Sequence, residues 1–579
     1  MSFAQTDEGF WQKRLTLTMP LTLGVIIVGP TFLLNYLASA SPEIRQWLNT
    51  PWQILVDLGF SALWQMGGEL LFRWTGTVPN DLYYDLMVGR FEWFGRALYG
   101  VALALLAFLI NLDFFSGPKT RPEPFGSARF ARKPETRKFQ KNTGRGLIVG
   151  SRDGTLRPRK SYYYDGNRHL LSLAPTRSGK GTCLIIPNLL TADRSVLVID
   201  PKGENARITA RQRETFGPVH VLDPFGVSGL ATSAYNPLAD LDADDPNFAD
   251  DAASLASALI IIKPGAREPH FEEGARSLMR GLIMFAAAEE PVERRTLVTV
   301  REYLTWPPDK FNGLLALMAE TPTAGGAIRR AANSFLGKRE AEARSIVSTA
   351  QEQTTFLESP GLGKSLARSD VAFSALKRET MTIYLVLPES RFESHGRWLR
   401  LLVARACQDI ERTPRPKPGP RDRKKGQAGA PPVLFLLDEF AAIGDMPAIK
   451  TAIGLMAGYD LQIWAFLQNW GQLEELYDKG AHTFAANSGV FHAFNINDTL
   501  TARYVSDLSG DATYTAPLSS LSLYETPPRP SARKLITPEE AMHRLSDADL
   551  FLKYAGTPPI IARKAHYYED KAMMRKAEA

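Results

Sequence analysis

The chain reads Leu-Ala-Pro-Thr-Arg-Ser-Gly-Lys-Gly-Thr at residues 173–182, between a strand-like run at 169–173 and a helix-compatible run at 182–190. Small residues let such a loop wrap tightly, so that successive backbone N–H groups point inward and the next helix presents its positive end. Lys180 would then neutralise the outer phosphates of a bound nucleotide. The sequence therefore predicts a phosphate-binding loop formed by Ala174, Pro175, Thr176, Arg177, Ser178, Gly179, Lys180, Gly181 and Thr182.

This loop departs from the pattern G-x-x-x-x-G-K-[ST] at two positions. Ala174 stands in place of the first glycine, and Gly181 stands in place of the Ser or Thr that binds Mg²⁺. Thr182 follows one residue later, and we expect its hydroxyl to reach the metal. A Gly-rich turn between a strand and a helix is the plain alternative, so the prediction needs a second motif.

A pair of carboxylates provides this second motif. The apolar run at 432–437 is typical of a parallel strand buried on both faces, and Asp438 and Glu439 follow it directly. Ligands of α/β sheets bind at the carboxyl ends of the strands. We therefore assign Asp438 to Mg²⁺, through a water molecule, and Glu439 to activation of the attacking water.

Two further strand ends carry polar residues. The apolar run at 195–199 ends in Asp200, which is a rival metal ligand, but it supplies a single carboxylate. We expect Asp200 to shape the floor beside the nucleotide. The run at 461–467 ends at Gln468, whose amide can sense the γ-phosphate or position water; a simple polar strand end is the alternative.

Composition indicates more than one domain and a reducing compartment. The chain has 579 residues and only two cysteines, Cys183 and Cys407, which excludes a disulfide framework or a cysteine-based zinc site. The formal net charge is +6, and residues 119–160 contribute thirteen Lys or Arg against three Asp or Glu. This basic segment either sets membrane topology and meets anionic lipid or contacts nucleic acid.

Two uncharged apolar runs, at 15–38 and 97–112, predict an N-terminal transmembrane anchor. The anchor would span residues 1–116, with helices at about 15–38 and 97–115 and a periplasmic segment at 39–93. Basic residues flank both spans on the outer ends of the anchor, so both chain termini should be cytoplasmic in the inner membrane. A cleaved signal peptide is the alternative for the first run.

The remaining sequence predicts an α/β domain with a helical insertion. The segments 161–240 and 375–579 carry the strands and the candidate site, and residues 241–374 show helical spacing, as at 271–287. Residues 117–160 are then a basic juxtamembrane segment. A Pro- and Gly-rich basic stretch at 411–430 predicts a loop.

In combination these motifs resemble the TraG-type coupling proteins of type IV secretion and conjugation, which are relatives of RecA-like and FtsK-type ring ATPases. The matching segments are residues 125–130, 175–181, 200–204, 273–278, 438–440, 468, 497–502 and 532–540. The resemblance covers nearly the whole chain. It implies a RecA-like P-loop nucleotide-binding domain with an all-helical insertion, using ATP and Mg²⁺.

The resemblance also implies a homo-hexamer at the bacterial inner membrane. Such a ring would receive a relaxase–DNA complex, grip DNA without sequence specificity, and deliver the substrate to the components and ATPases of a type IV secretion channel. A coupling ATPase dedicated to protein effectors or toxins is the first alternative. A non-catalytic nucleotide-binding receptor is the second, and a chromosome-pumping motor is the third.

Overall fold

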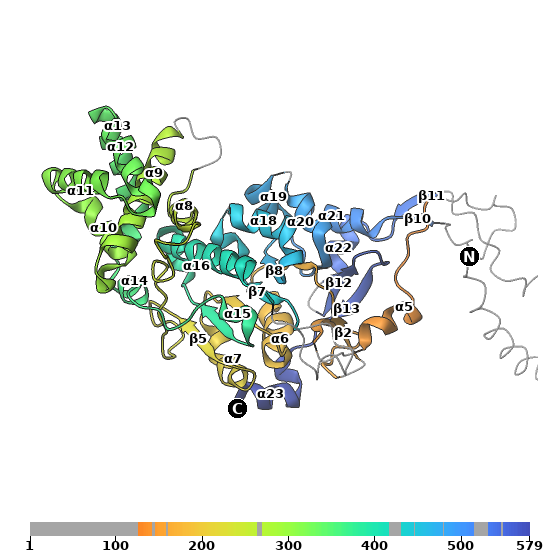
Figure 1. Ribbon diagram of the computed structural model, residues 1–579. Helices are drawn as coiled ribbons and strands as arrows, with labels where there is room; N and C mark the ends of the chain where they lie inside the picture. Colours follow the sequence, from red (N-terminus) through yellow and green to blue (C-terminus); the bar gives the residue numbers. More distant parts are fainter. Residues whose placement is uncertain are drawn as a thin grey trace, which may run out of the picture. The chain divides into compact units, whose positions relative to one another are not determined.

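The computed structural model describes residues 125–141, 145–157, 160–262, 269–415, 430–444, 446–478, 480–514, 531–545 and 548–578. All of these belong to one compact unit, residues 123–579 (Figure 1). The predicted spans at 15–38 and 97–115 and the segment 39–93 between them lie outside the described residues. Among the helices that are described, none has the length and apolar character needed to cross a bilayer.

A mixed sheet of eleven strands forms the centre, in the order β2-β1-β13-β12-β9-β3-β8-β7-β4-β6-β5. The strands from β9 to β5 in this order are parallel, and β12, β13, β1 and β2 extend the sheet in antiparallel pairs. The α/β fold predicted from the sequence is confirmed. The strands are β1 (Leu147–Ser151), β2 (Ser161–Tyr164), β3 (His169–Leu173), β4 (Val196–Ile199), β5 (Val219–Leu222), β6 (Thr382–Leu385), β7 (Val433–Leu437), β8 (Leu461–Leu467), β9 (Ser488–Ala493), β12 (Asp549–Tyr554) and β13 (Ile560–Arg563).

The parallel strands are buried on both faces, which is why they read as continuous apolar runs. Successive side chains alternate between two cores: Phe435 and Leu437 of β7 pack in one, and Leu434 and Leu436 in the other. The first core includes side chains of α16 (Phe392–Arg412), and the second includes side chains of α6 (Ile186–Thr191) and α7 (Glu204–Glu214). Both cysteines are buried and free.

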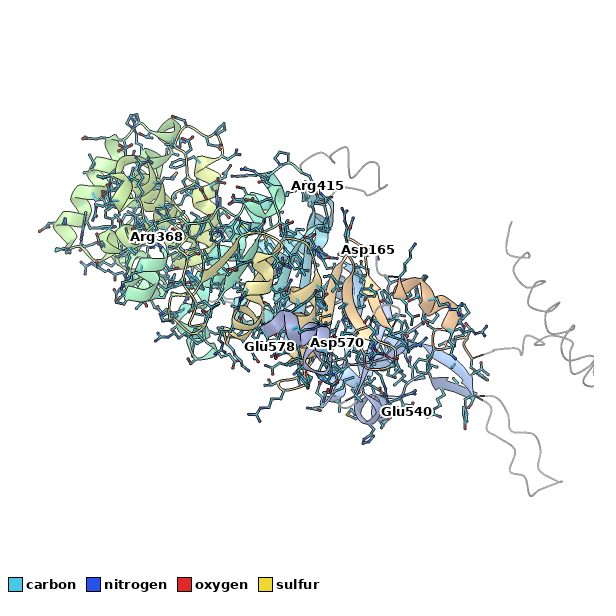
Figure 2. The ribbon with its side chains drawn as sticks, turned by 90° about the horizontal axis from the view of Figure 1, so that it is seen from below. Asp165, Arg368, Arg415, Glu540, Asp570 and Glu578 are labelled. Atoms are coloured by element: carbon cyan, nitrogen blue, oxygen red, sulfur yellow. The ribbon has the colours of Figure 1, made fainter. Side chains whose placement is uncertain are left out.

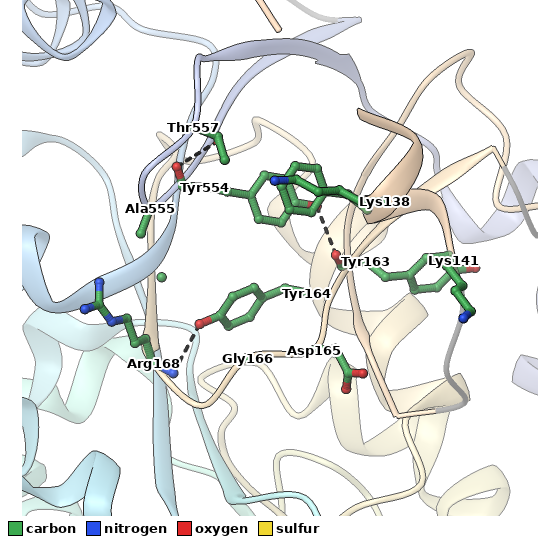
Figure 3. A pocket seen from close by; sticks show the side chains of 12 residues that line it. Lys138, Lys141, Tyr163, Tyr164, Asp165, Gly166, Arg168, Tyr554, Ala555 and Thr557 are labelled. Atoms are coloured by element: carbon green, nitrogen blue, oxygen red, sulfur yellow. Dashed lines mark hydrogen bonds between the residues drawn. The ribbon is translucent and has the colours of Figure 1, made fainter. Parts of the chain in front are cut away.

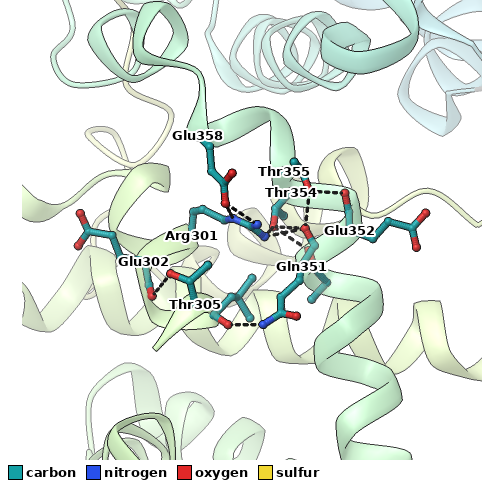
Figure 4. A network of polar contacts seen from close by, with 10 residues as sticks. Arg301, Glu302, Thr305, Gln351, Glu352, Thr354, Thr355 and Glu358 are labelled. Atoms are coloured by element: carbon teal, nitrogen blue, oxygen red, sulfur yellow. Dashed lines mark hydrogen bonds and ion pairs between the residues drawn. The ribbon is translucent and has the colours of Figure 1, made fainter. Parts of the chain in front are cut away.

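Between β5 and β6 the described elements are all helical. α8 contacts both α9 and α16, and thereby joins this helical region to the α/β core. Inside the region, the buried guanidinium of Arg301 donates to Glu358, Thr354 and the carbonyl of Gln351 (Figure 4). The helices are α8 (Phe248–Leu259), α9 (His270–Glu289), α10 (Leu297–Thr305), α11 (Pro308–Glu320), α12 (Ala327–Leu336), α13 (Glu340–Thr354), α14 (Pro360–Ser365) and α15 (Ala375–Arg378), with short turns η3 (Val292–Arg294), η4 (Ala324–Gly326) and η5 (Thr355–Glu358).

The sheet begins earlier in the chain than the predicted domain start at residue 161. β1 lies within the segment that we interpreted as juxtamembrane, because its apolar residues Leu147 and Val149 are fully buried in the sheet core. Before it come α5 (Lys133–Arg137) and η1 (Lys138–Gln140). A separate hairpin pairs β10 (Asp511–Tyr514) with β11 (Ser531–Lys534).

Further helices cover the C-terminal half of the chain. In the last of them, α23, the carboxylate of Asp570 accepts the backbone N–H groups of Ala572 and Met573 at 2.9 and 3.2 Å and so caps the first turn (Figure 2). Residues 416–429 of the predicted basic loop lie outside the described residues. These helices are α18 (Pro447–Leu455), α19 (Trp470–Tyr477), α20 (Gly480–Asn487), α21 (Thr499–Ser509), α22 (Pro538–Arg544) and α23 (Lys571–Glu578).

Candidate functional site

The loop after β3 has the conformation of an anion-binding turn. Ala174 is fully buried and still continues the strand, because its N–H donates to the carbonyl of Leu467 in β8 at 2.8 Å. The loop residues with a left-handed backbone conformation are instead Arg177, with φ 62°, and Gly179, with φ 88°. The first glycine of the sequence pattern is therefore not required at Ala174. Residues whose backbone φ angles alternate in sign point successive N–H groups inward and so form an anion-binding nest.

The helix that follows the loop opens with a π turn, η2 (Gly181–Ile185), closed by the N–H of Ile186 on the carbonyl of Gly181. A π turn holds one more residue than an α turn, and such turns are frequent at functional sites. No atom lies within 4 Å of a Cβ built on Gly181, among the described residues. A glycine is therefore not sterically demanded there, in contrast to Gly179.

Lys180 and the acid pair meet, although they come from strands that are not neighbours. The Lys180 ammonium donates to the backbone carbonyl of Asp438 at 2.9 Å and lies 3.3 Å from its carboxylate. The carboxylate of Glu439 is 3.7 Å from the same ammonium, and all three side chains are less than one-fifth exposed. Sequence separation between Lys180 and Asp438 is 258 residues, so the fold alone brings them together.

Gln468 joins this group from the end of β8, which lies between β3 and β7 in the sheet. Burial raises the pKa of the Glu439 carboxyl, while the Lys180 charge and a hydrogen bond from the Gln468 side chain oppose that rise. A carboxyl with a raised pKa holds a proton more readily, which suits a group that must accept one from water. The structure thus places Lys180, Asp438, Glu439 and Gln468 at one edge of the sheet.

Asp200 lies at the same edge, at the end of β4. It is 1% exposed, and burial raises its pKa to about 6, with the nearby Asp438 carboxylate acting in the same direction. Its carboxylate accepts the N–H of Ala206 at 2.8 Å, and the amide of Asn205 lies 3.4 Å from both Asp200 and Asp438. These bonds fix Asp200 behind the acid pair, as a floor residue.

Sequence reasoning missed two residues that hold the loop from the other side. The buried Lys564 ammonium donates to the carbonyl of Ser178 at 3.1 Å and to the side chain of Asn495 at 2.8 Å. His566 Nδ1 lies 2.8 Å from the hydroxyl of Thr182, which is also 3.1 Å from the carbonyl of Gly179. Nothing in the local sequence signals that Lys564 and His566 contact the loop, because their bonds to Ser178 and Thr182 join residues 384 or more positions apart.

One buried oxygen without a partner points to what the site would hold. Within the part of the chain that the structure describes, the hydroxyl of Ser178, which is 4% exposed, makes no hydrogen bond. One carboxylate oxygen of Asp438 is paired with the Lys180 ammonium at 3.3 Å but accepts no hydrogen bond. The described residues contain no cluster of three or more His, Cys, Asp or Glu that could hold a metal by itself. Mg²⁺ at nucleotide sites takes one or two protein oxygens and completes its shell with phosphate and water, and the Asp438 carboxylate is an oxygen of this kind. The predicted second ligand, the Thr182 hydroxyl, is bonded to His566 and to the carbonyl of Gly179 in this structure.

Two cavities lie away from the acid pair. One, of about 570 Å³, opens among Lys138, Tyr164, Arg168 and Tyr554 at the amino end of β3 (Figure 3). The other, of about 760 Å³, is bordered by Thr191, His566 and α23. Neither is lined by Lys180, Asp438 or Glu439. The candidate site is therefore defined by its polar groups and its loop geometry.

A buried parallel sheet, a phosphate-type loop with a lysine and an acid pair at its carboxyl edge define a nucleotide-binding α/β protein of the phosphate-loop class. The profile of a family described as "Type IV secretory system Conjugative DNA transfer" matches residues 131–579. The chain belongs to this family, the coupling proteins of type IV secretion.

Individual relatives agree. The chain is 30% identical to protein VirD4 of Agrobacterium fabrum, over 79% of this chain and 68% of the relative. It is 26% identical to the conjugal transfer protein TraG of Escherichia coli, over 94% and 88%. The solved structure of the conjugative coupling protein TrwBdeltaN70 superposes with a TM-score of 0.57 at 16% identity, covering 77% of this chain and 95% of that one, and so shares the fold.

Proposed function

We propose that this protein is a membrane-anchored ATPase that couples a relaxase–DNA complex to transfer through a type IV secretion system. The observation that carries the proposal is the meeting of Lys180 with Asp438 and Glu439 at 3.3 and 3.7 Å. A lysine on a phosphate loop and an acid pair at the end of another strand of the same sheet are the two parts that phosphoryl transfer to water requires.

Each side chain has a separate task in this proposal. Lys180, now paired with the acids, turns to the outer phosphates when a nucleotide enters the loop. Glu439 accepts the proton of the attacking water, and Gln468 holds the Glu439 carboxylate in position. Asp438, through a water molecule, and Thr182 would hold Mg²⁺, which would supply charge neutralisation at the phosphates when bound. An Arg from a neighbouring subunit would stabilise the developing charge.

The names of the relatives support the choice of partners. VirD4 and TraG are a type IV secretion protein and a conjugal transfer protein, respectively, and structures of TrwB exist with an ATP analogue and with ADP and Mg²⁺. We extend these properties to this chain: a homo-hexamer at the inner membrane that contacts channel components, with both termini cytoplasmic. DNA would be gripped through its phosphates, without sequence specificity and with strong salt dependence.

The test is phosphate release by the purified full-length protein. Glu439→Gln should lower turnover at least about 100-fold, the usual contribution of a general base, while ATP still binds. Glu389→Gln is the matched control, because Glu389 lies near the site and forms only an exposed ion pair with Lys202 at 3.7 Å. Single-stranded DNA of unrelated sequences should raise the wild-type rate. Wild-type turnover in Glu439→Gln would contradict the proposal.

A further inference from the structure

A pair of stacked rings lies beside the phosphate loop and has no part in the chemistry described above. The imidazole of His566 and the phenol ring of Tyr568 are nearly parallel, with centroids 5.1 Å apart and planes 12° from each other. Tyr567 meets Tyr568 edge-on, at 5.6 Å and 74°, which supports the outer ring. Tyr568 is nevertheless 50% exposed, so the pair offers an aromatic face to solvent.

The loop itself fixes this pair in place. The His566 ring bonds to the hydroxyl of Thr182 at 2.8 Å, and its Cε1 lies 3.0 Å from where a Cβ on Gly179 would be. The short helix η9 (Tyr567–Glu569), which carries Tyr568, also contacts η2. The rings are therefore anchored to the residues that cradle the inner phosphates, and their position follows that of the loop.

The sheet order shows on which side of the loop the rings lie. β7, which carries Asp438 and Glu439, and β13, which leads to His566, are on opposite sides of β3. The outer phosphates of a nucleotide must face the acid pair, since that is where water is activated. The phosphate chain runs along the loop, so the inner phosphate and the nucleoside leave it on the side of β13, where the rings are.

We propose that His566 and Tyr568 form a stacking platform for the base of the nucleotide bound at this loop. This inference rests on the proposed function. An exposed aromatic face stacks on any nucleobase, and such stacking contributes typically about tenfold or more to affinity. The hydroxyl of Ser178 in the same loop is buried and has no hydrogen-bond partner among the described residues. A ligand bound at this loop would supply that partner.

The experiment compares two ligands that share a diphosphate and differ in the nucleoside. ADP and inorganic pyrophosphate are titrated with Mg²⁺ into the full-length protein, using calorimetry. Tyr568→Ala should weaken ADP binding about tenfold, or about 1.4 kcal/mol, and leave pyrophosphate affinity unchanged. Tyr568→Phe should bind both ligands as the wild type does. Tyr459→Ala is the control, because Tyr459 is 44% exposed but precedes β8, at the opposite edge of the sheet.

Each outcome is decisive. Unchanged ADP affinity in Tyr568→Ala overturns the platform and leaves the proposed function standing. An equal loss of ADP and pyrophosphate binding also overturns it, because the ring would then only support the loop. A wild-type protein that binds neither ligand overturns the proposed function and the platform together.

Discussion

Outside the acid pair, Lys564 allows the most specific structural prediction, because its ammonium is bonded to the phosphate loop. The residue is 6% exposed, and its ammonium donates to Ser178 and Asn495 and lies 5.3 Å from the centre of the Phe494 ring. Lys564→Met keeps the length of the side chain and removes the charge. The carbonyl of Ser178 and the amide oxygen of Asn495 then each lose a charge-assisted bond.

The cost can be worked from these two bonds. A hydrogen bond to a charged group contributes about 1.5–3 kcal/mol, and two are lost, but the wild-type ammonium also carries a desolvation penalty that the variant no longer has. We expect the free energy of unfolding to fall by about 2–4 kcal/mol. Because the Ser178 carbonyl belongs to the loop, ATP affinity should fall as well, by roughly tenfold, or about 1.4 kcal/mol.

Urea unfolding and ATP titration measure the two effects. Lys553→Met is the matched control: Lys553 of β12 is half-buried and donates to the carbonyl of Thr557 at 3.3 Å, far along the chain from the loop residues. Its loss should cost less than about 1 kcal/mol and leave ATP affinity unchanged. The reasoning is refuted if Lys564→Met unfolds like this control and binds ATP with wild-type affinity.

Two further predictions concern the loop and the floor of the site. Gly179→Ala should destabilise the protein by about 1–3 kcal/mol and impair ATP binding, because φ at Gly179 is 88° and the added Cβ would lie 3.0 Å from Cε1 of His566. Gly181→Ala should stabilise the protein by about 0.5–1 kcal/mol, because no described atom lies within 4 Å of the added Cβ. Urea midpoints and ATP titrations of the two variants check this, and equal behaviour would contradict it. Asp200 has a pKa raised from 3.8 to about 6, so its unfolded form ionises first and stability is lost as pH rises between those values. Asp200→Asn removes this pH dependence, and the unfolding free energy of the variant relative to wild type should rise by about 2 kcal/mol from pH 4 to pH 6.5. A difference that is flat with pH would refute the assignment.

The sequence predicted the parallel half of the sheet closely. β3 and β8 occupy the expected residues, because apolar runs bounded by polar residues leave little choice of register. The antiparallel strands were not foreseen. β12, for example, reads Asp-Leu-Phe-Leu-Lys-Tyr, and its pairing with β9 and β13 depends on partners that no local pattern specifies.

The residues of the candidate site likewise fall into those that the sequence predicted and those that it did not. Lys180, Asp438 and Glu439 could be found from the sequence because each follows a strand, and the carboxyl ends of parallel strands meet at one edge. Lys564 and His566 follow the antiparallel strand β13 instead, so no edge rule places them beside the loop. Their role depends on the residues after β13 reaching the loop that follows β3, although β12 and β9 separate these two strands in the sheet, and only the tertiary structure reveals this.

Among the described residues, α16 is bonded both to the helical region and to the segment that follows the acid pair. At its C-terminal end, Gln408 and Arg412 both bond to the buried carboxylate of Asp251 in α8, the former at 2.6 Å. Closer to its N-terminal end, Arg400 donates at 2.7 Å to the carbonyl of Ile443, a few residues after Glu439. The bonds of α16 thus reach from the helical region to the segment that follows the acid pair.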